Sequence, residues 1–207
     1  MVIFYTLDLH PATLYQYIMF KDRRELLPTI SPRYFPFPAD PETIIIDGIP
    51  AYKYVDETDI QKLIMDFRSQ INLNWYEAIF LNREGGIPFG VDVANGHPVG
   101  FIKYKEDGEI SIPIPGRLKY ARILVLDDIY DTGITGSLIK LDAPNARLVY
   151  LTRKRDVPNL RSLEDTVWLS EIDKIWALGK GMNGEQPGDG LPVDWGRTFP
   201  GIAAKIL

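Results

Sequence analysis

The chain has 207 residues, of which 45% are hydrophobic and 25% are charged, with a formal net charge of −5 and no cysteine. This composition is typical of a globular protein, and the lack of cysteine excludes disulfides, thiol nucleophiles and Cys-ligated metal sites. The acidic charge argues against a dedicated binder of nucleic acid or membrane surfaces, and no signal peptide or membrane span is recognisable, so we expect a cytoplasmic protein.

Residues 1–55 read as an N-terminal addition to a main domain. Residues 2–10 are a candidate strand and residues 12–27 a candidate helix. Prolines recur from residue 28 to residue 50, so this part is expected to be extended or turn-like. Within it, residues 43–55 ("TIIIDGIPAYKYV") predict a hairpin with Asp-Gly at its tight turn.

The main domain, residues 56–155, alternates between predicted helices and strands. Residues 99–105 and 109–115 are predicted to pair with each other across an Asp-Gly turn. The run "ARILVLDD" is continuously apolar before its aspartates, as a strand buried on both faces should be. The other predicted elements are a helix over 57–71, a strand over 76–82, a helix over 88–95, a strand over 121–128, a short helix after the motif described below, and a strand over 146–154.

This alternation predicts an α/β fold, with a mostly parallel, twisted sheet flanked by helices. Ligands of such sheets bind beyond the carboxyl ends of the strands. Residues 156–207 differ from the core, because they become rich in Gly and Pro from about residue 173. We expect them to form a small C-terminal hood and tail over the strand ends.

The run "ILVLDDIYDTGIT", residues 123–135, joins a buried strand to carboxylates and a glycine loop. Asp127 and Asp128 need polar partners at a sheet edge, and the vicinal hydroxyls of a ribose are good partners for carboxylates. Residues 131–135 then enter a helix, whose first N–H groups and threonine hydroxyls suit a phosphate. The pattern therefore predicts a ribose 5-phosphate site.

Residues 123–135 resemble, position for position, the phosphoribosyl pyrophosphate signature of the type I phosphoribosyltransferases. The chain is most similar to the purine members, the hypoxanthine- and xanthine-guanine enzymes. The resemblance implies that Asp127 and Asp128 bind the ribose hydroxyls and that Asp131 is the general base in catalysis. It also implies a 5-phosphate site made by Asp131, Thr132, Gly133, Ile134 and Thr135.

Two further sites follow from the same resemblance. Arg83, Glu84 and Gly85 would form the pyrophosphate loop, and Arg197 would reach pyrophosphate from the C-terminal segment. Lys154 would bind the purine 6-oxo group, and Trp176 would stack on the base. The resemblance implies Mg²⁺ bound through the substrate, with Asp127 and Asp128 as candidate protein ligands.

The expected activity is Mg²⁺-dependent transfer of 5-phosphoribosyl from phosphoribosyl pyrophosphate to guanine, xanthine or hypoxanthine. The expected partners are these two substrates and a second copy of the chain in a homodimer, with no nucleic acid and no membrane. Two departures from the family pattern keep alternatives open: Glu84 interrupts the pyrophosphate loop, and Asn183 replaces an acidic residue. The alternatives are a non-catalytic, phosphoribosyl pyrophosphate-binding regulatory protein and a transferase for a non-purine acceptor.

Overall fold

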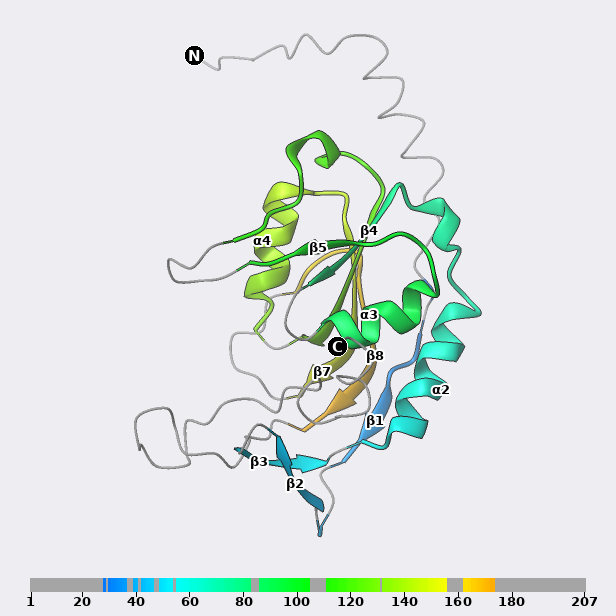
Figure 1. Ribbon diagram of the computed structural model, residues 1–207, viewed down its shortest axis with the longest axis vertical. Helices are drawn as coiled ribbons and strands as arrows, with labels where there is room; N and C mark the ends of the chain where they lie inside the picture. Colours follow the sequence, from blue (N-terminus) through cyan, green and yellow to red (C-terminus); the bar gives the residue numbers. More distant parts are fainter. Residues whose placement is uncertain are drawn as a thin grey trace, which may run out of the picture.

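A computed structural model shows a parallel sheet with helices on both faces (Figure 1). Its six strands lie in the order β1-β8-β7-β6-β4-β5, and each pairs with its neighbours in parallel. A separate antiparallel hairpin joins β2 to β3. The structure describes residues 28, 30–36, 39–40, 42–46, 49–53, 55–82, 86–104, 111–130, 132–155 and 162–173, with the backbone alone at 42–46, at 49–53 and at residue 88.

The strands are short except in the middle of the sheet, where β6 and β7 each have eight residues. The strand bounds are β1 (Arg33–Phe35), β2 (Glu42–Ile46), β3 (Ile49–Lys53), β4 (Ala78–Asn82), β5 (Gly100–Ile102), β6 (Ile123–Tyr130), β7 (Arg147–Lys154) and β8 (Thr166–Ile172). The helices are α2 (Glu57–Arg68), α3 (Gly86–Ala94) and α4 (Ile134–Asp142), with 3-10 turns at η1 (Leu73–Trp75) and η2 (Gly116–Leu118).

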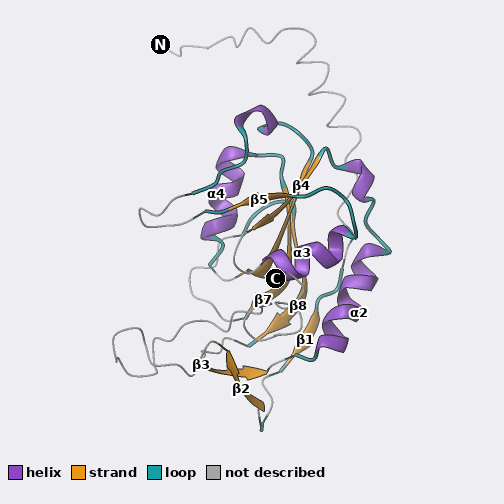
Figure 2. Cartoon of the chain, in the orientation of Figure 1, coloured by secondary structure: helices purple, strands orange, loops and turns teal. Residues whose placement is uncertain are grey.

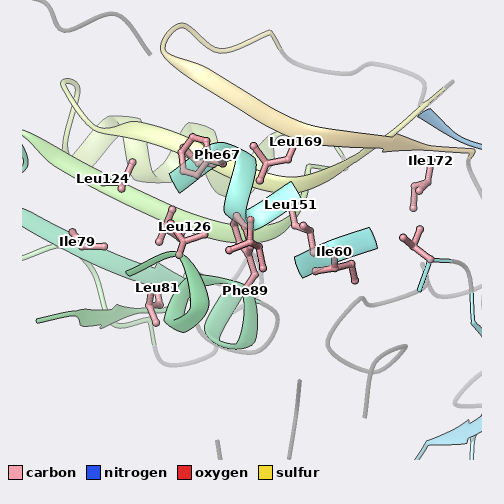
Figure 3. Close-up of a cluster of buried hydrophobic side chains, with 14 residues drawn as sticks. Ile60, Phe67, Ile79, Leu81, Phe89, Leu124, Leu126, Leu151, Leu169 and Ile172 are labelled. Carbon is pink, nitrogen blue, oxygen red and sulfur yellow. The ribbon is translucent and has the colours of Figure 1, made fainter. Parts of the chain in front are cut away.

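Helices α2 and α3 cover one face of the sheet, and α4 covers the other (Figure 2). On α2 the buried residues are Ile60, Ile64 and Phe67, spaced to form one helical stripe. Together with Phe89 and Val93 of α3 they pack on the sheet in what we call the α2–α3 cluster (Figure 3). The α4 cluster lies on the opposite face and contains Ile139, Val125, Leu148 and Tyr150.

The inward and outward alternation of side chains reverses near the carboxyl ends of the central strands. In β6, Leu126 and Ile129 both contact the α2–α3 cluster although they are three residues apart, and Leu169 and Ile172 do the same in β8. In a regular strand, residues on one face are separated by even numbers. The pairing of the strands does not slip at this reversal. Between β6 and β7 the same register joins Asp127 to Tyr150 and Ile129 to Thr152, and between β7 and β8 one register joins Tyr150 to Trp168 and Thr152 to Ser170.

Several predicted elements are confirmed. Helix α2 ends three residues before the predicted end at 71. Strands β4 and β7 lie within their predicted ranges, and β6 overlaps its predicted range. The predicted hairpin is the β2–β3 pair. The α/β sheet prediction is also confirmed, since every strand pair in the described sheet is parallel. Within the described ranges, no helix is both long and apolar enough to cross a bilayer.

Other features differ from the prediction. β6 does not end at Asp128 but continues to Tyr130, so both aspartates lie inside the strand. The predicted pairing of 99–105 with 109–115 is reduced to one antiparallel bridge, Lys103–Ile112. Strands β1 and β8, which complete one side of the sheet, were not predicted from the sequence. The predicted elements at 2–10 and 12–27 lie outside the described residues.

Candidate functional site

The connections after β4 and β6 leave adjacent strands toward opposite faces of the sheet. β4 pairs with β6, and the chain after β4 forms α3 on the α2–α3 face, whereas the chain after β6 forms α4 on the other face. β4 continues to β5 on one side, and β6 continues to β7 on the other. This is a topological switch point, the position at which open α/β sheets bind ligands. The predicted ribose 5-phosphate motif lies there.

Asp127 lies at this switch point with its side chain almost fully buried, at 5% exposure. Its Oδ2 accepts a hydrogen bond from Asn82 Nδ2 at 3.0 Å, and its Oδ1 accepts one from the backbone N–H of Asp128 at 3.0 Å. Burying a carboxylate is costly unless it is hydrogen-bonded, and these donors offset part of that cost. Asp128 is less buried and follows directly in β6.

The start of α3 packs directly on this part of β6. A Cβ added to Gly86, the first residue of α3, would lie 2.6 Å from the Leu126 carbonyl oxygen and 3.0 Å from the Asp127 Cα. Such distances leave no room for a side chain, so glycine is required for this close approach. Asn82 at the end of β4 and Gly86 at the start of α3 therefore both contact Asp127 or its backbone.

The loop into α4 has the features expected of a phosphate site. Gly133 takes a left-handed backbone conformation, with φ of 81°, and is the N-cap of α4. The N-cap residue itself has no side chain to cap the helix, but the N–H of Ile134 donates a hydrogen bond to Thr132 Oγ1 at 3.4 Å. The first-turn N–H groups of a helix need partners, and an anion is well placed to supply them. Thr132 and Thr135 are both partly buried here.

Helix α4 rests on two tyrosines of the sheet. Tyr150 of β7 is buried, and burial is the main cause that raises its pKa well above the ordinary value, with Asp127 a further cause. Tyr130 at the end of β6 packs edge-on against Tyr150, with ring centroids 4.9 Å apart, and burial also raises its pKa. Both phenols therefore stay neutral at ordinary pH, and both rings belong to the α4 cluster.

Lys154 is the last residue of β7 and is only 2% exposed. It pairs in register with Ile172, whose side chain belongs to the α2–α3 cluster, so Lys154 points to that face of the sheet. Its neighbour Arg153 points to the other face, where its guanidinium lies 4.4 Å from the Trp168 ring and 2.7 Å from the Glu171 carboxylate.

Arg155 completes this basic run and is held at the sheet edge beyond β8. Its guanidinium lies 4.3 Å from the ring of Tyr34, and the Tyr34 hydroxyl donates to Asp173 at 2.7 Å. Arg153 and Arg155 thus both pair with aromatic rings through cation–π contacts. The sequence has three consecutive basic residues at this strand end, Arg153, Lys154 and Arg155, and any of them is a candidate for binding a base. Lys154 differs from Arg153 because it is buried and points to the α2–α3 face of the sheet.

The other predicted site residues lie outside the described residues. They are Arg83, Glu84, Gly85, Asp131, Trp176 and Arg197, together with Asn183, which was noted as a departure from the family pattern. The structure therefore places Asp127, Asp128 and residues 132–135 around one switch point and Lys154 at the end of the adjacent strand. Sequence reasoning missed Asn82; its signal was a polar residue ending the apolar run "AIFLN".

The described residues suit Mg²⁺ only in part. Asp127 and Asp128 provide carboxylate oxygens, which are the ligand type that Mg²⁺ prefers. However, the described part of the chain contains no group of three or more His, Cys, Asp or Glu side chains that could hold a metal ion. Mg²⁺ often binds through one or two carboxylates plus substrate phosphates, and the aspartate pair fits that mode.

A cavity of about 430 Å³ lies elsewhere, between α2 and the segment around β1. Its lining includes Ile30, Arg33, Lys62, Phe67 and Leu169 and none of the predicted site residues. It lies on the α2 side of the sheet, away from the motif loop that leads into α4. We place the candidate site at the switch point, because the aspartates of β6 and the N-terminus of α4 lie there.

No family model matches the sequence, and a search of curated proteins finds no match. Among solved structures, the chain is similar to a hypoxanthine-guanine phosphoribosyltransferase from Bacillus anthracis, with a TM-score of 0.50 and 14% identity, covering 66% of this chain and 85% of that chain. A purine phosphoribosyltransferase from Pyrococcus horikoshii Ot3 is also similar, with a TM-score of 0.47 and 22% identity, covering 59% of this chain and 87% of that chain. A hypoxanthine phosphoribosyltransferase from Staphylococcus aureus has a TM-score of 0.44 and 17% identity, covering 62% of this chain and 78% of that chain. The chain has the type I phosphoribosyltransferase fold, which confirms the fold predicted from the sequence.

Proposed function

We propose that the protein is an enzyme that transfers the 5-phosphoribosyl group from phosphoribosyl pyrophosphate to guanine, xanthine or hypoxanthine. The products are pyrophosphate and the nucleoside 5′-monophosphate. The observation that carries this proposal is the position of Asp127 and Asp128 in β6, the strand that leads through the left-handed Gly133 into the N-terminus of α4 at the topological switch point. A pair of carboxylates beside a phosphate-binding helix end matches the two ends of a ribose 5-phosphate.

Each part of the sugar phosphate has a partner in this proposal. Asp127 and Asp128 accept hydrogen bonds from the ribose hydroxyls. The 5-phosphate binds the backbone N–H groups and hydroxyls of residues 131–135, where the left-handed Gly133 turns the chain into α4. The interactions orient the ribose so that its anomeric carbon faces the base.

The reaction breaks the bond between the anomeric carbon and the pyrophosphate oxygen and forms a bond to a purine nitrogen. Positive charge develops on the ribose in an oxocarbenium-like transition state, and negative charge develops on the leaving pyrophosphate. Arg83, Glu84, Gly85 and Arg197 form the pyrophosphate site, and the arginines stabilise the leaving charge. Asp131 is the general base that takes the proton from the purine nitrogen. The chain therefore acts by positioning, charge stabilisation and proton removal.

Lys154 and Trp176 hold the base. A buried lysine at the carboxyl end of β7 can donate to the purine 6-oxo group, and Trp176 stacks on the purine plane. Asp127 and Asp128 would help to hold Mg²⁺ together with the substrate, and the metal would neutralise charge on the pyrophosphate. We also propose residues 56–155 as the catalytic core, residues 1–55 and 156–207 as its additions, and a homodimer in the cytoplasm as the working form.

A second candidate function is binding of phosphoribosyl pyrophosphate without turnover, in a regulatory protein. Glu84 in the pyrophosphate loop and Asn183 in place of an acidic residue favour it, because both departures lie where the family handles the leaving group and its metal. A transferase for a non-purine acceptor is the remaining alternative. Lys154, Trp176 and Arg197 together favour the purine enzyme.

The test is release of pyrophosphate by the purified protein with phosphoribosyl pyrophosphate, Mg²⁺ and a panel of purine and pyrimidine bases. We expect release that depends on guanine, xanthine or hypoxanthine and is lost in Asp131→Asn. Asp66→Asn is the matched control, because Asp66 is an exposed residue on α2. Calorimetric binding of phosphoribosyl pyrophosphate without release for any base would support the regulatory protein. Neither binding nor release would contradict both candidates.

A further inference from the structure

Among the side chains of β4, only Asn82 forms a hydrogen bond with a described residue of the candidate site. It is the last residue of β4, and the register pair Leu81–Leu126 places it beside Asp127 in β6. Its Nδ2 lies 3.0 Å from Asp127 Oδ2. The contact joins segments 45 residues apart in the sequence.

The chemistry of the pair fixes the orientation of the amide. An ionised carboxylate only accepts hydrogen bonds, so the NH₂ group of Asn82 must face Asp127 and the amide oxygen must point elsewhere. That oxygen, Oδ1, is buried and has no hydrogen-bond partner within the described residues. A buried acceptor without a partner is unfavourable and is uncommon in folded proteins. A hydroxyl of a bound ligand that reaches Oδ1 would supply the missing donor.

Asp127 is contacted from both ends of the connection between β4 and α3. Asn82 holds its carboxylate at the start of that connection, and Gly86 packs against its backbone at the end. Because Asp127 is nearly buried, few other directions are open to its carboxylate. The Asn82 amide therefore holds Asp127 Oδ2, while the backbone N–H of Asp128 holds Oδ1.

We propose that Asn82 is a positioning residue of the phosphoribosyl site, and this inference rests on the proposed function. Its Nδ2 fixes the rotamer of the ribose-binding carboxylate of Asp127, and its Oδ1 accepts a hydrogen bond from a hydroxyl of the bound sugar phosphate. Asn82 thereby ties the end of β4, and with it the start of the pyrophosphate loop, to the residue that binds the ribose.

The experiment is a double-mutant cycle on the affinity for phosphoribosyl pyrophosphate, measured by calorimetry in the presence of Mg²⁺. Asn82→Leu keeps the approximate size of the side chain and removes both polar groups. We expect it to weaken binding about tenfold, the loss typical of a hydrogen bond to a charged group. In the Asp127→Asn background the same change should weaken binding less than about threefold, because a residue that acts through Asp127 has little left to position.

Three comparisons separate positioning from a purely structural role. Asn145→Leu is the matched control, since the Asn145 amide is exposed and only contacts the Tyr120 carbonyl. Asn82→Leu should raise the KM for phosphoribosyl pyrophosphate with kcat little changed, whereas partial unfolding would lower kcat alone. Asn82→Ser, which retains a small donor and acceptor, should bind more tightly than Asn82→Leu; it also replaces the leucine variant if that variant does not fold.

Each outcome decides the inference. Equal losses from Asn82→Leu in the two backgrounds would show that Asn82 does not act through Asp127 and would overturn the positioning role alone. Unchanged affinity in Asn82→Leu would do the same. If the unmodified protein does not bind phosphoribosyl pyrophosphate, the proposed function itself fails, and the inference fails with it.

Discussion

Gly136 in α4 lies against the hydroxyl of Tyr150 in β7, so that a Cβ on this glycine would stand 2.9 Å from the phenol oxygen. The same Cβ would lie 2.6 Å from a methyl group of Leu163. The motif "DTGITG", residues 131–136, therefore ends in a glycine that serves helix packing. The depth at which α4 rests on the sheet depends on this contact.

We expect Gly136→Ala to lower the free energy of unfolding by about 1–3 kcal/mol, because the added methyl group overpacks the interface between α4 and β7. The measurement is urea unfolding. Gly116→Ala is the matched control, since a Cβ at Gly116 would meet nothing within 4 Å. Equal effects of the two substitutions would contradict the packing role assigned to Gly136.

The stability of the protein should fall as the pH rises above 10, in part because of Tyr150. Burial raises the pKa of Tyr150 well above 10.0, so this phenol stays neutral in the folded state while the unfolded chain ionises. A group with a raised pKa stabilises the fold below its unfolded pKa, and that contribution is lost as the pH rises. Its loss amounts to about 1.4 kcal/mol per pH unit for one buried group.

Tyr150→Phe should therefore lose less stability than the unmodified protein between pH 9 and pH 11, measured by urea unfolding at each pH. Tyr104 also has a raised pKa, but it is present in both proteins and cancels in the comparison, whereas Tyr130 is itself one cause that raises the pKa of Tyr150. Tyr120→Phe, at an exposed position, is the control. Parallel pH profiles of Tyr150→Phe and the unmodified protein would contradict this assignment.

Lys154→Met and Arg153→Met should have different effects, because the two side chains point to opposite faces of the sheet. Lys154→Met should raise the KM for the base about tenfold while the KM for phosphoribosyl pyrophosphate stays the same, since a donor to the 6-oxo group is lost. Arg153→Met should leave both KM values unchanged and lower the free energy of unfolding by about 1 kcal/mol. That loss comes from the Trp168 and Glu171 contacts.

Steady-state kinetics and urea unfolding of the two variants check this prediction. The opposite pattern, with the base KM raised only in Arg153→Met, would move base binding to the α4 face, beside Trp168. A change in both KM values for both variants would indicate a general distortion of the strand end. Either result would overturn the assignment of Lys154.

Removal of Mg²⁺ should abolish pyrophosphate release without changing the unfolding temperature of the ligand-free protein. The described residues hold no group of three or more metal-binding side chains, so the metal is expected to bind together with the substrate. With phosphoribosyl pyrophosphate present, Mg²⁺ should raise the unfolding temperature through the tighter complex. A rise caused by Mg²⁺ alone would indicate a metal site formed by the protein itself.

The sequence predicted those parts of the fold that depend on neighbouring residues. The helical stripe of Ile60, Ile64 and Phe67 and the apolar runs of β4, β6 and β7 are local patterns, and they gave the helix and the strands. β8 was missed because Ser170 and Glu171 interrupt its apolar run, and β1 because prolines surround it. Both strands become strands through pairing with β7 and β8 in the folded sheet.

By itself the sequence determined the α/β class and the candidate phosphoribosyl site, because the strand, the aspartate pair and the glycine loop of that site are contiguous from 123 to 135. Only the tertiary structure decided the strand order, the contact of Asn82 with Asp127 and the faces of Arg153 and Lys154. The reason is physical. Strand order and side-chain contacts depend on pairing between distant segments, and the reversal of alternation occurs in both β6 and β8. The alternation of apolar and polar residues along a single strand does not reveal that reversal.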